Sequence, residues 1–287
     1  MVRPRLPVRL VVLDLDGTVL GPDLVVRPRV RIAIAETRAR GVPVVIATGR
    51  MFRSARRHAL ALGLRGPLIC YQGGYVRELP GVGDAVAHDA GDGRLLYHRP
   101  MRRDVARETL DWASAAGLEA HLNVDDELYM ARGDVAAPDY ERRSGIDAHL
   151  VPDLHAVLAR RSPTKVLAVG PAGLPERLLV EGRRRFAGRA QVTVSHPEYL
   201  EFTAPGVTKG RAVRWLARRM GIPLGTVLAV GDQHNDAEML ELVGHGVAMG
   251  GSPAAVRAAA RYVTAPYGAD GAALALEALV LGRGGLD

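Results

Sequence analysis

The nine residues LVVLDLDGT, at positions 10–18, join a continuous apolar run to two carboxylates and a glycine. A strand that is apolar on both faces is typical of a parallel sheet covered by helices. Asp14 and Asp16 would then lie at the carboxyl end of that strand, where open α/β sheets bind ligands. Gly17 lets the backbone turn away while both carboxylates stay near one ligand. Taken alone, the stretch also fits a polar turn, because Asp-Gly is a common turn signal.

Strand and helix patterns alternate through the first and last thirds of the chain. After the first apolar run, helical periodicity at 29–40 is followed by an apolar run at 42–47. Helical periodicity at 52–62 is followed by another run at 67–71, and the alternation returns after Pro205. Between about 79 and 197 the pattern changes to helices mixed with adjacent strands, including a hairpin around Asp125-Asp126. We therefore predict an α/β fold. Its Rossmann-like three-layer core with a mainly parallel sheet would comprise residues 1–79 and 198–287, and residues 80–197 would form an inserted α+β domain.

Composition narrows the class of protein. A chain of 287 residues that is 48% hydrophobic can bury a sizeable core. Its longest apolar runs are far shorter than the roughly 20 residues that cross a bilayer. The basic segment 1–9 lacks the apolar region and cleavage site of a secretory signal, so we expect a cytoplasmic protein with no membrane partner. Cys70, the single cysteine, lies in an apolar stretch and is expected to be a buried structural thiol.

The basic residues are almost all arginine. The net charge is +7, but the arginines are scattered and little aromatic interleaving accompanies them, so we expect solvated helix faces and no nucleic-acid partner. Only Lys165 and Lys209 are lysines. Lys209 follows Thr208 at the start of a predicted helix, where a cation opposes the macrodipole, and this placement indicates an anionic partner. Lys165 begins an apolar run and is interpreted as a strand-end residue of the insert.

Two further motifs follow predicted strands. Thr48-Gly49-Arg50 ends the second strand, where the Thr48 hydroxyl and the Gly49 N–H could hold a phosphoryl oxygen, or Thr48 could cap the next helix. Gly231-Asp232 to Asn235-Asp236 follows the apolar run 226–230. Carboxylates of Asp14 and Asp232 with the Asp16 carbonyl would suit Mg²⁺. Asn235 and Asp236 could orient water, hold Lys209 in place or cap a helix, whereas His234 is expected to be an exposed loop residue.

In order and spacing, these four elements resemble the motifs of the haloacid dehalogenase (HAD) superfamily. The long insert after the second motif and the stretch Val247-Ala248-Met249-Gly250 look like its Cof-type branch, the class IIB hydrolases. The resemblance spans essentially the whole chain and is strongest in the core. Gln72-Gly73 is a departure, since that branch usually carries Asn-Gly at this point.

The resemblance implies a Mg²⁺-dependent phosphatase that acts on a small phosphorylated metabolite, such as a sugar phosphate, through an aspartyl-phosphate. Asp14 would be the nucleophile, and Asp16 the general acid and then the base. The implied metal site is Asp14, Asp16 through its carbonyl, and Asp232. The insert would be a mobile cap that excludes bulk water. The expected phosphate-binding residues are Asp14, Thr48, Gly49, Arg50, Lys209 and Asn235.

Other functions share parts of this pattern. A phosphomutase of the same superfamily would also use Asp14 but would retain the phosphate. A receiver-like phosphoacceptor also places aspartates and a lysine at strand ends, but an insert of ~120 residues argues against a bare domain of that size class. A Rossmann oxidoreductase fits poorly, because no G-x-G-x-x-G follows the first strand. The sequence leaves the natural substrate and the oligomeric state open.

Overall fold

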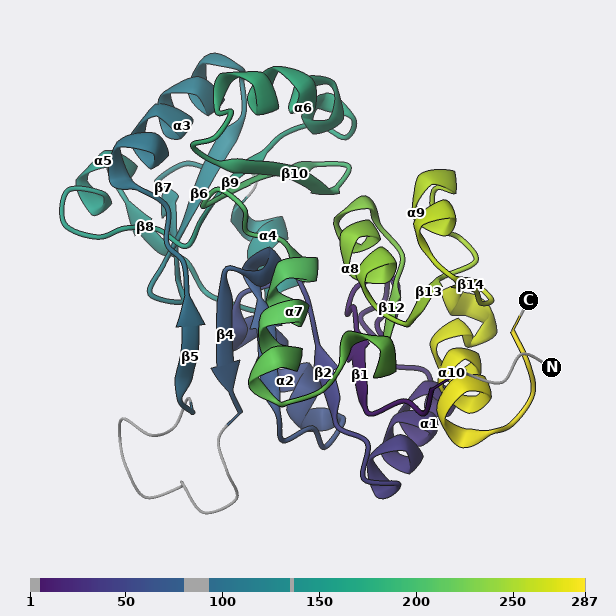
Figure 1. Cartoon of the computed structure of the whole chain (residues 1–287). Helices are drawn as coiled ribbons and strands as arrows, with labels where there is room; N and C mark the ends of the chain where they lie inside the picture. Colours follow the sequence, from purple (N-terminus) through teal and green to yellow (C-terminus); the bar gives the residue numbers. More distant parts are fainter. Residues whose placement is uncertain (1–5, 80–92, 135–136, 287) are drawn as a thin grey trace.

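The computed structural model describes residues 6–79, 93–134 and 137–286. The predicted start of the insert at residue 80 lies in the segment 80–92, outside the described residues. Figure 1 shows two groups of elements, one around β1 and the other around β6.

The first group is built on a five-stranded parallel sheet in the order β14-β13-β12-β1-β2. Each neighbouring pair is parallel. This confirms the predicted parallel core sheet. The strands are β1 (Leu10–Leu13), β2 (Val44–Ile46), β12 (Val227–Gly231), β13 (His245–Ala248) and β14 (Tyr262–Val263).

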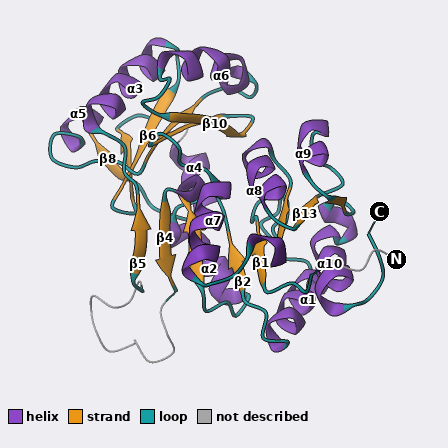
Figure 2. Cartoon of the chain, viewed as in Figure 1, coloured by secondary structure: helices purple, strands orange, loops and turns teal. Residues whose placement is uncertain are grey.

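Helices cover both faces of this sheet, as Figure 2 shows. Alternate residues of β1 enter different apolar clusters: Val11 and Leu13 pack with α1, α2 and α10, whereas Leu10 and Val12 pack with α7, α8 and α9. Burial on both faces explains the continuous apolar run in the sequence. The helices are α1 (Pro28–Ala39), α2 (Phe52–Ala61), α7 (Lys209–Arg219), α8 (Ala237–Leu242), α9 (Ala254–Ala259) and α10 (Gly271–Leu276), which continues as a π-helix over Glu277–Leu281.

A small antiparallel sheet extends from this core. It contains β3 (Pro67–Cys70), β4 (Tyr75–Glu78) and β5 (Leu95–His98), and a single parallel bridge between Ala47 and Ile69 links β3 to the edge of the main sheet. The sequence pattern did not predict β4. It placed β5 in the insert, whereas the structure pairs β5 with β4.

The second group is built on a six-stranded sheet in the order β10-β11-β9-β6-β7-β8. Every pair is antiparallel except β7 and β8. β11 lies between β10 and β9, although the predicted division assigned residues from 198 onward to the core. The strands are β6 (Glu119–Val124), β7 (Glu127–Ala131), β8 (His149–Val151), β9 (Lys165–Val169), β10 (Gln191–His196) and β11 (Tyr199–Thr203).

Four helices belong to this second group: α3 (Arg103–Ala115), α4 (Ala137–Ser144), α5 (Leu154–Val157) and α6 (Leu174–Arg185). Val151 of β8 pairs with Ala131 of β7, and α5 is a single turn. The sequence pattern did not predict α4 or β8. The predicted hairpin is confirmed: Asp125 and Asp126 join β6 to β7 with φ of 51° and 62°.

The two faces of the six-stranded sheet have different neighbours. Leu122, Val166 and Phe202 enter an apolar cluster with residues of α3 and α6. On the other face, Leu128 and Leu167 join the apolar cluster of the parallel sheet. The second sheet is therefore buried against the first group. None of the helices in the described residues is long and apolar enough to cross a membrane.

Candidate active site

Three buried aspartates meet at the carboxyl ends of neighbouring parallel strands. Asp14 follows β1, Asp232 follows β12, and Asp236 precedes α8. One carboxylate oxygen from each lies within 4.8 Å of the other two. The register of the sheet creates this cluster, because the Asp14 N–H donates to the Val230 carbonyl at 2.9 Å. The structure thus brings together the residues at the ends of two predicted strands.

Lys209 lies inside this cluster. Its Nζ donates to Asp14 Oδ1 at 2.5 Å and to Asp236 Oδ1 at 2.6 Å, and its side chain is 1% exposed. Thr208 caps α7 by accepting the Arg211 N–H at 3.2 Å, so Lys209 occupies the first turn as predicted. Burial acts to lower the pKa of Lys209, but the two carboxylates outweigh burial and raise it. The side chain is therefore a fixed cation next to Asp14.

Hydrogen bonds hold Asp232 and Asp236 in place. Asp236 Oδ2 accepts the N–H groups of Asp232 and Gln233 at 3.0 and 3.1 Å. Asp232 accepts from Thr18 Oγ1 at 3.2 Å and from Gln233 Nε2 at 3.1 Å. Gly17 has a φ of +84°, and a Cβ at this residue would lie 2.3 Å from Asp232 Oδ2. Position 17 therefore requires glycine, because the backbone after Asp16 lies directly against the side chain of Asp232.

The residues present fit a divalent cation. Burial raises the pKa of Asp14 well above its usual range, and Lys209 offsets only part of this effect. Burial, reinforced by Asp236, raises the pKa of Asp232 to about 6. The carboxylates of Asp14, Asp232 and Asp236 thus have only the Lys209 ammonium to balance their charge within the cluster. Oxygen ligands with excess negative charge suit a hard cation such as Mg²⁺. The Asp16 carboxylate is not part of this cluster.

Asp16 and Arg50 form an ion pair beside the cluster. Arg50 Nε lies 2.8 Å from Asp16 Oδ2, and Nη2 lies 2.6 Å from Oδ1. Thr48 is buried, and its hydroxyl accepts the Arg50 N–H at 3.1 Å. The interpretation of Thr48 as the cap of the next helix is wrong, because α2 begins at Phe52 and its N-cap residue is Met51. Arg50, expected at the phosphate, contacts the expected general acid.

The second group of elements also contacts the segment 49–54, through Lys165, Arg143 and Ser144. Lys165 Nζ donates to the Gly49 carbonyl at 3.1 Å, and Arg50 Nη1 donates to the Arg143 carbonyl at 3.2 Å. Ser54 Oγ donates to the Ser144 carbonyl at 2.6 Å. The segment 49–54 is therefore enclosed between the two groups of elements.

Asp126 makes the most complete of these contacts. Its carboxylate accepts the N–H groups of Phe52 and Arg53 at 2.9 and 3.0 Å and the Tyr71 hydroxyl at 2.7 Å. A residue of the β6–β7 turn thus caps α2, which has no cap from its own side chains. Sequence reasoning identified Asp126 only as a turn residue, because nothing local to a hairpin indicates what its tip contacts.

Asn235 and Gln72 form a second bridge. Asn235 Nδ2 donates to Gln72 Oε1 at 2.9 Å, and Gln72 Nε2 donates to Glu201 Oε2 at 3.1 Å. Asn235 was expected to bind the phosphate, and in the structure its side-chain nitrogen donates to Gln72. His234 is exposed, as predicted, and Cys70 is buried, with its pKa raised by burial.

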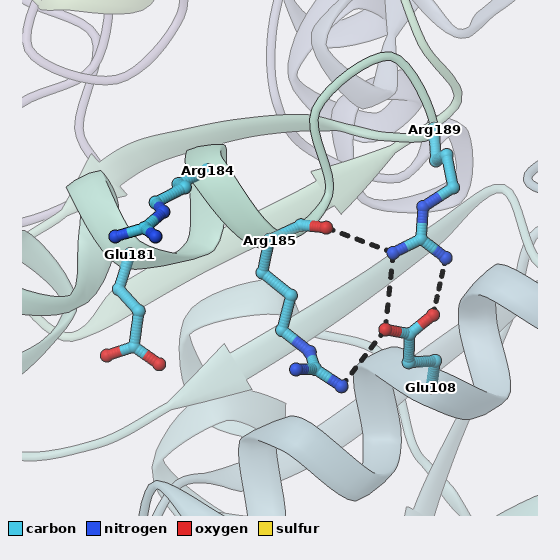
Figure 3. A pocket seen from close by; sticks show the side chains of 5 residues that line it. All are labelled: Glu108, Glu181, Arg184, Arg185 and Arg189. Atoms are coloured by element: carbon cyan, nitrogen blue, oxygen red, sulfur yellow. Dashed lines mark hydrogen bonds and ion pairs between the residues drawn. The ribbon is translucent and has the colours of Figure 1, made fainter.

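A hollow on the second group contains none of the predicted site residues. Figure 3 shows its lining from α3, α6 and the segment that follows α6, where Glu108 pairs with Arg185 at 3.1 Å and with Arg189 at 2.5 Å. Glu108 thus pairs with two of the three arginines of this hollow, and no residue of the aspartate cluster lines it.

Comparison with known proteins agrees with this geometry. Residues 11–276 match the family model for haloacid dehalogenase-like hydrolases. An HMP-PP phosphatase from Serratia proteamaculans is 34% identical over 250 residues, which cover 84% of each chain. The 5-amino-6-(5-phospho-D-ribitylamino)uracil phosphatase YitU of Bacillus subtilis is 27% identical and covers 92% of this chain and 94% of its own. A crystal structure of a haloacid dehalogenase-like hydrolase from Bacteroides thetaiotaomicron superposes with a TM-score of 0.79 at 25% identity, covering 94% of this chain and 99% of that one.

Proposed function

Because the chain belongs to the family of haloacid dehalogenase-like hydrolases, we propose that it is a Mg²⁺-dependent phosphatase acting on a small phosphorylated metabolite. The observation that carries this proposal is the buried Lys209 ammonium, 2.5 Å from Asp14 and 2.6 Å from Asp236. A fixed cation beside a carboxylate at a strand end suits phosphoryl transfer, in which charge spreads over the phosphoryl oxygens. The phosphatase relatives named above support a small metabolite as substrate.

Asp14 is the nucleophile in this proposal. Its carboxylate attacks phosphorus, the bond from phosphorus to the leaving-group oxygen breaks, and Asp16 donates a proton to that oxygen. Lys209 and the Thr48 hydroxyl hold the phosphoryl oxygens during transfer. Because Asp16 is paired with Arg50, the Asp16 carboxyl has to exchange this partner for the leaving group.

Hydrolysis of the aspartyl-phosphate completes the reaction. Asp16, now ionised, accepts a proton from a water molecule whose oxygen attacks phosphorus. The bond from phosphorus to the Asp14 oxygen breaks, which restores the carboxylate and releases inorganic phosphate. Lys209 stays in place through Asp236, whose other oxygen is bonded to two backbone N–H groups.

Asp14 and Asp232, with the Asp16 carbonyl, would hold Mg²⁺. The bound cation would neutralise the carboxylates and the phosphoryl oxygens so that two anions can approach each other. We further propose that the group built on the six-stranded sheet is the inserted cap. Its contacts with Gly49, Arg50 and Ser54 would exclude bulk water from the reaction.

Phosphate release from phenyl phosphate tests the proposal. We expect hydrolysis that requires Mg²⁺ and stops with EDTA, and Asp14→Asn should abolish it while circular dichroism shows an intact fold. Asp23→Asn is the matched control, because Asp23 is an exposed residue of the loop after β1. Full activity in Asp14→Asn would refute the assigned nucleophile.

Two further measurements separate the parts of the proposal. Intact-protein mass spectrometry after acid quenching should detect phosphorylated wild-type protein and none in Asp14→Asn. Titration calorimetry should show weaker Mg²⁺ binding in Asp232→Asn, independently of activity. A phosphomutase would form the same phosphorylated protein but transfer the group to a second substrate position, so stoichiometric release of free phosphate would exclude it.

A further inference from the structure

The chain passes twice between the two groups of elements, and a second hollow lies where it does so. The first crossing comprises residues 99–102, between β5 and α3, and the second comprises residues 204–208, between β11 and α7. Arg99 of the first crossing and Gly206 of the second both line the hollow. The other large side chains in its wall are Tyr97, Arg211 and Trp215. A molecule that fills this hollow would therefore contact both crossings at once.

The turn that follows β3 touches both crossings. The Arg99 N–H donates to the Gly74 carbonyl at 2.8 Å, which ties the first crossing to this turn. A Cβ on Gly73 would collide with the Thr208 carbonyl, so the same turn packs directly on the second crossing. The wall of the hollow is therefore built from backbone segments that are in contact with one another, and it does not depend on a single side chain.

The hollow contains cations that no carboxylate balances. Arg99 and Arg211 are exposed, and in the described part of the chain neither side chain pairs with a carboxylate. Arg211 Nη1 donates only a long hydrogen bond, of 3.4 Å, to the Gly206 carbonyl. The hollow of Figure 3 differs, because Glu108 pairs there with two arginines. Guanidinium groups with free donors bind carboxylate or phosphate oxygens in pairs, so the hollow at the crossings favours an anion.

An aromatic wall stands beside these cations. The rings of Tyr97 and Trp215 are half-buried, and their centroids lie 5.4 Å apart. Arg211, Trp215 and Arg219 recur at every fourth residue of α7 and so share one face of this helix. The Arg219 guanidinium lies 5.7 Å from the centroid of the Trp215 ring. A pair of partly exposed rings among cations suits a planar ring that carries negative charge.

We propose that this hollow is a regulatory site for a small aromatic anion, a single planar ring that carries a carboxylate or phosphate group. Its volume of about 200 Å³ lies below the roughly 300–1,000 Å³ of sites for drug-sized ligands, so one ring with one acid group is the matching size. Arg99 and Arg211 hold the acid group, and the ring lies against Tyr97 and Trp215. Because the ligand contacts both crossings, it restrains the movement of the two groups and lowers kcat. Only this effect on kcat rests on the proposed phosphatase function.

The two tryptophans of the chain allow a direct test of binding. Trp215 lines the hollow, whereas Trp112 lies in the apolar cluster with α3 and α6 and serves as the internal control. We would titrate ¹⁵N-tryptophan-labelled protein with benzoate and, separately, with phenylphosphonate, without Mg²⁺, and assign the indole resonances with Trp215→Phe. At least one of the two acids should shift the Trp215 resonance saturably and leave that of Trp112 unchanged, and the lower Kd identifies the acid group.

Altered probes and variants separate this site from general attraction of anions. Benzyl alcohol, which lacks the charge, should bind about tenfold or more weakly than benzoate, and cyclohexanecarboxylate, which lacks the aromatic ring, about 2- to 10-fold more weakly. Arg99→Met and Arg211→Met should each raise Kd about tenfold or more. The matched control is Arg177→Met, an exposed arginine of α6, and it should leave Kd unchanged. No saturable shift of Trp215 with either acid, or equal Kd values in all three variants, would overturn the inference. So would a shift that persists in Arg99→Met and Arg211→Met but disappears in Lys209→Ala, because the anion would then lie at the active site.

Kinetics test the regulatory effect. With Mg²⁺ and glycerol phosphate as substrate, the tighter-binding acid at saturation should lower kcat of wild-type protein by about twofold or more, because movements of this kind limit turnover in many enzymes. The same acid should leave kcat of Arg211→Met unchanged. A rise in KM without a change in kcat would mean competition at the active site and would overturn the regulatory role. A saturable shift of Trp215 in a protein that releases no phosphate from any substrate would uphold the binding site and refute the phosphatase function instead.

Discussion

Asp126 links the insert to the core at the start of α2, and Asp126→Ala tests the strength of this link. The change removes the helix cap, which costs about 1 kcal/mol. It also leaves the buried Tyr71 hydroxyl without its acceptor, at about 1–3 kcal/mol. We therefore expect the free energy of unfolding to fall by about 2–4 kcal/mol at pH 7.5, measured by urea denaturation. Hydrogen exchange at the amides of Phe52 and Arg53 should accelerate, because these N–H groups lose their acceptor.

Asp125→Ala is the matched control. Asp125 precedes Asp126 in the same turn, also with positive φ, so alanine carries a similar backbone cost at both positions. The Asp125 carboxylate contacts Arg161 at the surface, and such pairs contribute about 0–1 kcal/mol. The difference between the two variants therefore isolates the contact with α2.

The pH dependence gives this prediction a definite sign. Burial raises the pKa of Asp126 to about 6, although its hydrogen bonds act in the opposite direction. A raised pKa in the folded state means that proton binding stabilises the fold below that pKa, and this contribution is lost as pH rises through about 6. At pH 5 the contribution amounts to about 1.4 kcal/mol, so the gap between wild type and Asp126→Ala should widen by that amount between pH 7.5 and pH 5. Equal losses in the two alanine variants, or a gap that narrows on acidification, would refute the reasoning.

Two further predictions concern the charges of the active site. Lys209→Ala should reduce kcat for phenyl phosphate far more than Lys165→Ala, because only Lys209 contacts Asp14; comparable losses would show that the two lysines share one role. Mg²⁺ should raise the Tm of wild-type protein by compensating Asp14 and Asp232, with about 2.7 kcal/mol of stabilisation at a concentration of 100 times Kd. The rise should disappear in Asp232→Asn, and a rise of equal size in that variant would place the cation elsewhere.

The sequence predicted the core sheet and the convergence of its acidic residues for a physical reason. Strands buried on both faces have continuous apolar runs, so β1 and β12 were recognisable. β1 and β12 are parallel and end at the same edge of the sheet. This brings Asp14 near Asp232 independently of the conformation of the loops between them. These features depend on local patterns and on one general property of sheets.

The contacts between the two groups of elements were not predictable in this way. α4 is a polar segment in which Tyr140 and Ser144 are the buried residues among 138–144, and its position depends on partners distant in the sequence. The scarcity of lysine drew attention to Lys209, whereas Lys165 was interpreted only as a strand-end residue. A strand-end position does not tell which face of the sheet the side chain takes. Register with Asn123 and Thr203 decides that, and register is a long-range property.

The two lysines of this arginine-rich chain are both almost fully buried, at 1% and 2% exposure. Amine-directed reagents therefore have two side-chain targets, Lys165 beside Gly49 and Lys209 beside Asp14, both almost out of contact with solvent. The rate at which Lys165 is acetylated would report how often the six-stranded sheet moves away from Gly49, without an engineered label.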